Sequence, residues 1–181
     1  EPKLKIMGIE AVKSSTPGPC RKAIKDALKV MMSGTEDEVI EFIDNFRKEF
    51  KSLPPEDISF PRSVSDVVKY KGRNAIYEKG TPIHVRGSLL FNHHVKRLGL
   101  EGKYSLIGNG EKVKFCYLRS PNPIHENVMS FIQDFPREIG IEKYIDYDLQ
   151  FEKSFLDPLK IILDTIGWDV EKTVTLESFF M

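Results

Sequence analysis

Two stretches near the start of the chain carry the period of an amphipathic helix. Between Pro19 and Met32, apolar residues recur at spacings of three and four and so share one helical face. Gly34 ends this pattern, and Thr35 caps the next one, with Glu38 in the position of a capping-box partner. A Pro-Pro pair then ends the second pattern. The sequence therefore predicts two antiparallel helices joined by a short Gly-Thr turn.

Helical periodicity returns three times further along the chain. Residues 63–70 indicate a short helix capped by a serine, and residues 85–98 indicate a longer one that ends at Gly99. Residues 149–168 form a long late run in which Pro158 is expected to kink or break the helix. The apolar positions in and near this run predict core residues: Tyr144, Phe151, Phe155, Leu156, Leu159, Ile162 and Leu163.

Alternating apolar and polar residues indicate two strands. Residues 3–11 alternate around a glycine, and in residues 112–118 Val113 and Phe115 alternate with lysines. These elements predict an α+β fold that is mostly helical, with a helical hairpin, a long late helix and a small antiparallel sheet.

Composition narrows the class of protein. The chain has 181 residues, 40% apolar and 30% charged, which is enough for one good core or two small ones. No apolar run approaches the roughly 20 residues of a membrane helix, which predicts a soluble cytoplasmic protein. Because Cys20 and Cys116 lie far apart and outside C-x-x-C spacing, we expect ordinary thiols. The first residue is Glu1 rather than Met, so we expect a piece of a longer chain.

The formal net charge of zero hides an uneven distribution. Residues 62–119 hold twelve Lys and Arg against four Asp and Glu, a net charge of +8. Residues 134–181 carry −6, and the remaining segments are close to neutral. A basic centre of this kind predicts one anion-binding face on an otherwise ordinary protein.

The stretch 69–87, KYKGRNAIYEKGTPIHVRG, concentrates this charge. Its cations alternate with tyrosines and glycines, a composition that suits contact with a polyanion such as a nucleic acid. His84 and Arg86 are expected at a helix N-terminus, where backbone N–H groups already favour a phosphate. By composition alone, a solvated charged loop is an equally good interpretation.

Two possible metal sites are rejected on spacing. His84, His93 and His94 are not placed at i, i+4, so we expect no metal there. Asp146 and Asp148 imitate a catalytic Asp-x-Asp pair, but they open a helical run, where residues two apart diverge by roughly 200°. We expect neither group to hold a metal.

The order of these motifs resembles the end of a family B DNA polymerase of large tailed bacteriophages. KLKIMGIEAVKSSTP is similar to the segment that leaves the palm sheet, and K-G-x-P followed by HVRG is similar to the thumb that grips primer–template DNA. GEKVKFCYLRSPNP and the late helix also resemble that thumb. The resemblance implies three parts: the end of a palm-like strand at 1–14, a thumb domain at 15–170 and a clamp-binding tail at 171–181.

This resemblance implies a part of a replicative DNA-directed DNA polymerase, a nucleotidyltransferase of phage DNA replication in the host cytoplasm. The catalytic aspartates of the family lie upstream, so the fragment should be inactive and hold no cofactor, whereas the parent enzyme would use Mg²⁺. Its expected partners are primer–template DNA and the remainder of the polymerase, without a membrane. The expected DNA-binding residues, with Arg86 foremost, are Lys69, Tyr70, Lys71, Lys79, His84, Arg86, Gly87, Lys112 and Lys114.

The tail EKTVTLESFFM places Leu176, Phe179 and Phe180 at i, i+3 and i+4. It is similar to the motif with which replication proteins bind a sliding clamp, although the usual glutamine is absent. The alternative is that both phenylalanines fold back onto the protein.

A different class of function also fits the charge pattern. The chain could be a non-enzymatic protein-interaction module whose basic face meets an acidic partner. An independent enzyme has little support, because the sequence shows no nucleophile–base pair, Gly-rich phosphate loop or metal cluster.

Overall fold

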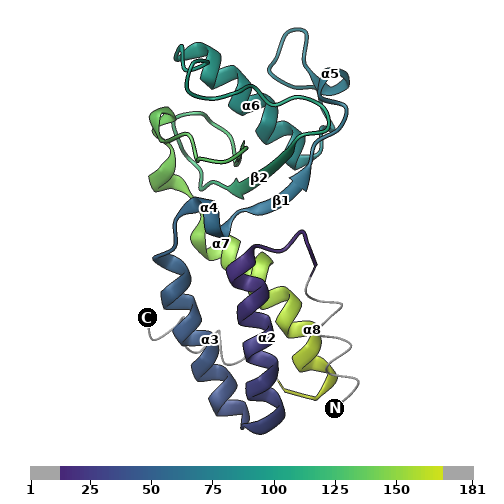
Figure 1. Ribbon diagram of the computed structural model, residues 1–181, viewed down its shortest axis with the longest axis vertical. Helices are drawn as coiled ribbons and strands as arrows, with labels where there is room; N and C mark the ends of the chain where they lie inside the picture. The colour runs from purple at the N-terminus through teal and green to yellow at the C-terminus, as the bar shows by residue number, and fades with distance from the viewer. Residues whose placement is uncertain (1–12, 169–181) are drawn as a thin grey trace. The chain divides into compact units, whose positions relative to one another are not determined.

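The computed structural model describes residues 13–168, which form two compact units. Residues 13–53 and 151–168 make the first unit, and Pro54–Gln150 make the second (Figure 1). Helices predominate beside one three-stranded antiparallel sheet, which confirms the predicted α+β class. Among the described residues, no helix is both long and apolar enough to cross a membrane. Apart from residues 13 and 14, both units fall within the predicted thumb domain, whose boundaries stay a prediction.

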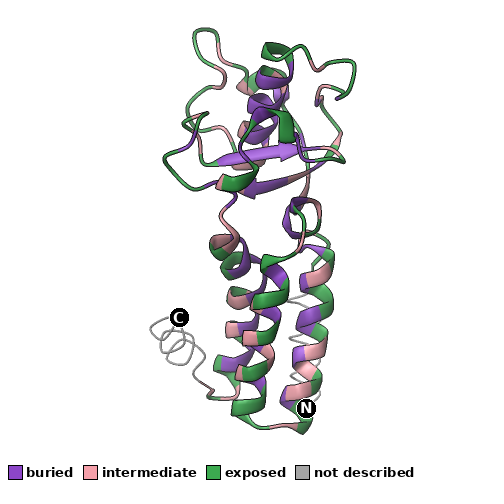
Figure 2. Ribbon diagram, turned by 90° about the vertical axis from the view of Figure 1, so that its left-hand side faces the viewer, coloured by how far each residue is buried: buried purple, intermediate pink, exposed green. Residues whose placement is uncertain are grey.

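Helices α2 (Gly18–Ser33) and α3 (Glu36–Lys51) form the predicted hairpin of the first unit. Thr35 Oγ1 accepts a hydrogen bond from the backbone N–H of Glu38 at 3.3 Å, which confirms the predicted cap. Three acidic residues in the first turn of α3 also favour the positive end of the helix dipole. The inner faces of both helices are buried and their outer faces exposed (Figure 2).

The late helix packs against this hairpin through aromatic rings. Helix α7 (Tyr147–Phe151) continues into a π-helical segment (Glu152–Leu156) and then into α8 (Asp157–Thr165). The ring centroid of Phe46 lies 5.8 Å from that of Phe151 and 4.8 Å from that of Phe155. Pro158 lies in the first turn of α8, where the missing N–H of proline is tolerated. The widened π-helical turn precedes the proline, and the helical path continues through it.

The second unit is built on the sheet, with strand order β1-β2-β3. β1 (Phe60–Ser63), β2 (Lys112–Tyr117) and β3 (Val128–Phe131) pair antiparallel, with Phe60 opposite Phe115 and Tyr117 opposite Val128. β2 confirms the strand predicted at 112–118. The helix predicted over 63–70 is shorter in the structure. Ser63 is the last residue of β1, and only Val67–Tyr70 form a helix, α5. A further short helix, α4 (Pro55–Ile58), precedes β1.

Helix α6 (Ile83–Arg97), predicted over 85–98, covers the sheet and packs chiefly on β3. The close approach occurs at Gly87, where a Cβ atom would lie 2.9 Å from the backbone nitrogen of Ser130 and closer still to its hydroxyl. Ser130 Oγ donates a hydrogen bond to the carbonyl of His84 at 2.9 Å across the same contact. Gly87 therefore fixes the distance between α6 and the sheet.

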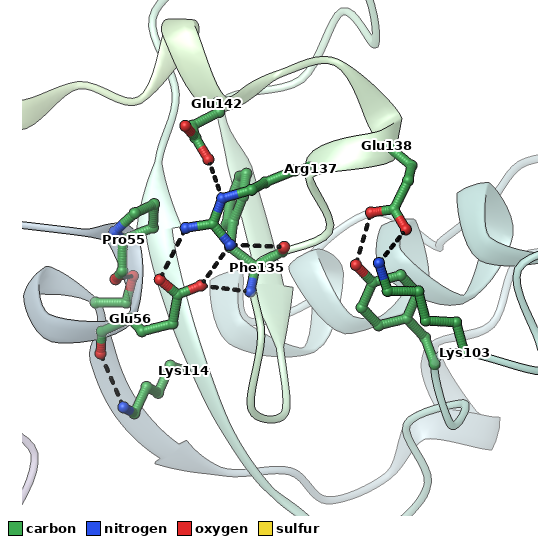
Figure 3. A network of polar contacts seen from close by, with 10 residues as sticks. Pro55, Glu56, Lys103, Lys114, Phe135, Arg137, Glu138 and Glu142 are labelled. Atoms are coloured by element: carbon green, nitrogen blue, oxygen red, sulfur yellow. Dashed lines mark hydrogen bonds and ion pairs between the residues drawn. The ribbon is translucent and has the colours of Figure 1, made fainter.

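A polar network fastens the chain between β3 and α7 to the rest of the second unit (Figure 3). The carboxylate of Glu56 accepts hydrogen bonds from the backbone N–H of Phe135 at 2.8 Å and from both terminal nitrogens of Arg137 at 3.0 and 3.1 Å. The first of two 3₁₀ turns (Arg137–Ile139 and Glu142–Tyr144) supplies this arginine, and the second supplies Glu142, which lies 2.5 Å from Arg137 Nε.

Replacing Gly87 by Ala should lower the free energy of unfolding by about 1–3 kcal/mol, because the added methyl group would push α6 off β3. Urea unfolding followed by circular dichroism measures the effect. Gly102→Ala is the control, since a Cβ at Gly102 meets no atom within 4 Å. Equal stability of the two variants would contradict the assigned role of Gly87.

Candidate nucleic-acid interface

The loop 71–82 between α5 and α6 contains two of the predicted DNA-binding residues, Lys71 and Lys79, and five more lie on the two helices that flank it. Lys71 and Tyr77 face each other in an isolated antiparallel bridge, and the N–H of Glu78 donates to the carbonyl of Tyr70 at 2.8 Å. Gly72 allows the tight turn between them, because a Cβ there would collide with the backbone of Ala75. The loop is thus a closed turn with a defined backbone.

Arg86 lies in an internal network that anchors this loop. Its guanidinium donates to the carboxylate of Glu126 at 3.1 Å and to the side chain of Asn127 at 2.7 Å. The hydroxyl of Tyr77 donates to the other carboxylate oxygen of Glu126 at 2.7 Å, and the guanidinium lies 5.7 Å from the Tyr77 ring centroid. The side chains of Arg86 and Glu126 are only 21% and 18% exposed. Arg86 therefore joins the loop, α6 and the segment before β3.

Several other cations of the basic middle segment also bind the protein itself. Lys114 Nζ donates to the carbonyl of Glu56 at 2.8 Å, as Figure 3 shows. Lys103 pairs with Glu138 at 2.8 Å, Arg119 donates to the carbonyl of Lys143, and Arg97 donates to His94 Nδ1 at 3.1 Å. These side chains stabilise the fold, so their charges are not all available to a ligand.

Six exposed cations of residues 62–119 have no such partner. Within residues 13–168, their side chains make no hydrogen bond or ion pair with another residue. We call them the open cations: Lys69, Lys71, Arg73, Lys79, Lys96 and Lys112. Four of them are among the predicted DNA-binding residues, whereas Arg73 and Lys96 were missed. The excess of positive charge within residues 62–119 was the sequence signal that could have included Arg73 and Lys96. That their side chains lack partners can be seen only in the folded chain.

The remaining predicted residues have different surroundings. Tyr70 is half-buried, and the ammonium of Lys69 lies 5.1 Å from its ring centroid. Burial and the nearby charge of Arg62 lower the pKa of His84, although its hydrogen bond to the Ser63 backbone opposes this shift. Gly87 is buried against β3, and packing accounts for this glycine. Direct DNA contact by any of these residues stays a prediction.

Asp146, one of the residues considered as metal ligands, has a structural role. Asp146 Oδ1 accepts the backbone N–H of Leu149 at 3.0 Å and so caps α7. Within the described part of the chain, no three His, Cys, Asp or Glu side chains form a group that could hold a metal ion. Cys20 and Cys116 are buried free thiols, and burial raises their pKa to about 11 and about 12. The predicted clamp-binding residues Leu176, Phe179 and Phe180, and most of the palm-like strand, lie outside the described residues.

Two phage DNA polymerases are similar to the chain in sequence. The DNA-directed DNA polymerase of Enterobacteria phage T4 is 32% identical over 184 residues, which cover 99% of the chain and 20% of the phage protein. The DNA-directed DNA polymerase of Escherichia phage RB69 is 32% identical over 185 residues, with the same coverage. The chain thus spans about a fifth of the length of these relatives. No protein-family model matches.

The expected resemblance to bacteriophage DNA polymerases is confirmed. Because the alignments cover 99% of the chain, they extend over both units.

His94 makes the stability of the chain depend on pH. The side chain is buried, its Nε2 lacks a hydrogen-bond partner among the described residues, and burial lowers its pKa from 6.5 to about 4. The unfolded chain therefore binds a proton at a higher pH than the folded chain does. The contribution of His94 to the free energy of unfolding is fully present above the unfolded pKa of 6.5. Acidification to pH 4 should remove at most about 3 kcal/mol of it.

Urea unfolding between pH 7.5 and pH 4 measures this loss, and His94→Gln should flatten the profile over that range. His125→Asn is the control, because His125 is exposed and asparagine tolerates its positive φ of 54°. An unchanged slope in His94→Gln would show that other groups cause the acid destabilisation.

Proposed function

We propose that the chain is the thumb portion of a replicative family B DNA-directed DNA polymerase and grips primer–template duplex through its phosphates. The main support is that 99% of the chain aligns with two phage DNA polymerases. The open cations of the second unit support it, since exposed and unpaired Lys and Arg are what phosphate contact requires. Contacts of this kind position the duplex without reading its sequence.

In this proposal the chain contributes binding and the rest of the polymerase contributes chemistry. The two metal-binding aspartates of such enzymes lie in a part of the polymerase upstream of this segment, where Mg²⁺ would be held. The fragment alone is inactive and acts in the cytoplasm of the infected host. Its partners are the duplex and the remaining polymerase chain.

The proposal gives Arg86 a positioning role. Its guanidinium is already paired with Glu126, so binding a phosphate would break an ion pair that is largely shielded from solvent. The network of Arg86, Glu126 and Tyr77 instead holds the loop that presents Lys71, Arg73 and Lys79. Loss of any member of the network should weaken binding through the loop.

Fluorescence anisotropy of a labelled primer–template, titrated with the chain at several salt concentrations, tests the proposed binding of duplex DNA. Lys79→Ala should raise Kd and lower the slope of log K against log salt by about 0.9, because one phosphate contact is lost. A wild-type chain that is folded but does not bind DNA at low salt would contradict the proposal. That outcome would favour the protein-interaction module.

Glu126→Gln separates direct contact by Arg86 from positioning by Arg86. If Arg86 bound a phosphate directly, removing the opposing carboxylate charge would strengthen DNA binding. The positioning role predicts weaker binding, because the loop loses its ion pair. Glu101→Gln is the matched control, since Glu101 is exposed and outside the network. Tighter binding by Glu126→Gln than by Glu101→Gln would refute positioning.

The tail adds a proposed tether to a sliding clamp, supported by Leu176, Phe179 and Phe180 at helical spacing in the sequence. Deleting residues 176–181 should leave DNA affinity within a factor of about two and abolish clamp binding, because the deleted segment carries none of the open cations. Surface plasmon resonance on immobilised clamp measures the second effect. Clamp binding that survives the deletion would rule out the tether.

A further inference from the structure

A hollow of about 720 Å³ lies in the second unit between α5, α6 and two loops. Leu89, Asn92, His93 and Lys96 form its α6 wall, since residues three, four and seven apart share one helical face. The opposite side is the closed turn 71–76, and residues 107–109 complete the lining. The volume is in the range of about 300–1,000 Å³ that is usual for small-molecule pockets.

Hydrogen bonds between the walls give this pocket a fixed shape. The side-chain amide of Asn92 donates to the carbonyl of Ile107 at 2.9 Å and accepts the N–H of Ile107 at 2.7 Å. Asn109 Oδ1 accepts the N–H of Val67 at 2.7 Å, which joins the same loop to α5. The bridge between Lys71 and Tyr77 closes the remaining wall. A preorganised pocket loses little entropy when a ligand enters.

The lining combines an aliphatic surface with unopposed positive charge. Val67, Ile76, Leu89 and Ile107 supply apolar area, and the neighbouring Val68 is 79% exposed at the rim. Three open cations also line the pocket: Lys71, Arg73 and Lys96. No Asp or Glu is part of the lining formed by the described residues.

We propose that this pocket takes one unpaired nucleotide of a DNA strand, with its base against the aliphatic wall and His93 and its phosphate on Arg73 and Lys96. A nucleotide matches the lining because it joins a flat, largely apolar ring to an anion. The exposed imidazole of His93 offers a face on which a base stacks, as aromatic side chains do in single-strand binding. The inference rests on the proposed function, which brings DNA to the second unit.

NMR titration of the ¹⁵N-labelled chain tests the pocket directly. Its backbone reporters are Gly72, Ile76 and Gly108, and the Asn92 side-chain amide is a fourth. Thymidine 5′-phosphate at millimolar concentration should shift these signals, whereas inorganic phosphate should shift them several-fold less. A duplex with one unpaired 3′ thymidine should shift them at a concentration at least tenfold lower than free nucleotide, and a blunt duplex should not.

Variants distinguish nucleotide binding in the pocket from binding of duplex DNA elsewhere on the second unit. Arg73→Ala combined with Lys96→Ala should remove the response to thymidine 5′-phosphate, and His93→Ala should weaken it several-fold. Lys143→Ala is the control for loss of an exposed cation, because Lys143 is exposed in the same unit and does not line the pocket. Blunt-duplex affinity, measured in parallel, reports on the proposed function independently of the pocket.

Four outcomes would overturn the inference, whatever the duplex affinity. Absence of shifts with thymidine 5′-phosphate would exclude a nucleotide site. Equal shifts with inorganic phosphate would reduce the pocket to a simple anion site. A response to the unpaired thymidine no stronger than to free nucleotide would exclude a strand-borne ligand, and a response to blunt duplex at the same positions would assign the cations to the duplex face.

Discussion

The carboxylate of Glu126 accepts two hydrogen bonds that attach the loop 71–82 of the second unit to α6. One comes from Arg86 on α6 and the other from Tyr77 at the end of the closed turn. Burial and the hydrogen bond to Glu126 raise the pKa of Tyr77, so its hydroxyl stays a donor at neutral pH. Without this carboxylate, a partly buried guanidinium would lack its counter-charge and the turn would lose its attachment to α6.

The same arrangement recurs twice in the second unit. Glu56 binds Arg137 together with the N–H of Phe135, and Glu138 binds Lys103 together with the hydroxyl of Tyr104 at 2.7 Å. The contacts from Lys103 and Tyr104 hold the pKa of Glu138 at about 2. Each glutamate thus neutralises a cation and satisfies a neutral donor. The cations that stabilise the fold are paired in this way, whereas the open cations are not.

Local sequence signals were sufficient for much of the fold. The cap at Thr35, the period of α6 and the alternation of β2 each depend on residues a few positions apart, and all three were predicted correctly. β3 was missed because its four residues are all buried, so no alternation marks it as a strand. The short β1 was not predicted, and only its last residue, Ser63, fell within the predicted helix, because its residues carry little periodicity of their own.

The candidate interface was predictable in composition but not in detail. A charge count shows that residues 62–119 are basic, yet the partner of Arg86 lies 40 positions away and that of Lys103 lies 35 positions away. Such pairings follow from how α6, the sheet and the 3₁₀ turns meet, which no local pattern encodes. Arg86 was therefore ranked above Arg73 and Lys96, although its charge is already used within the protein.

The separation of the two kinds of cation also bears on how the surface meets DNA. An exposed lysine loses little hydration on reaching a phosphate and releases a counterion from DNA, so it contributes to affinity at low cost. A paired arginine must first give up its carboxylate, which opposes binding. In the proposed function, the six open cations supply the phosphate contacts, and the three glutamates hold the shape of the surface that presents them. Neutralising a glutamate and neutralising an open cation should thus both weaken binding, although they change the net charge in opposite directions.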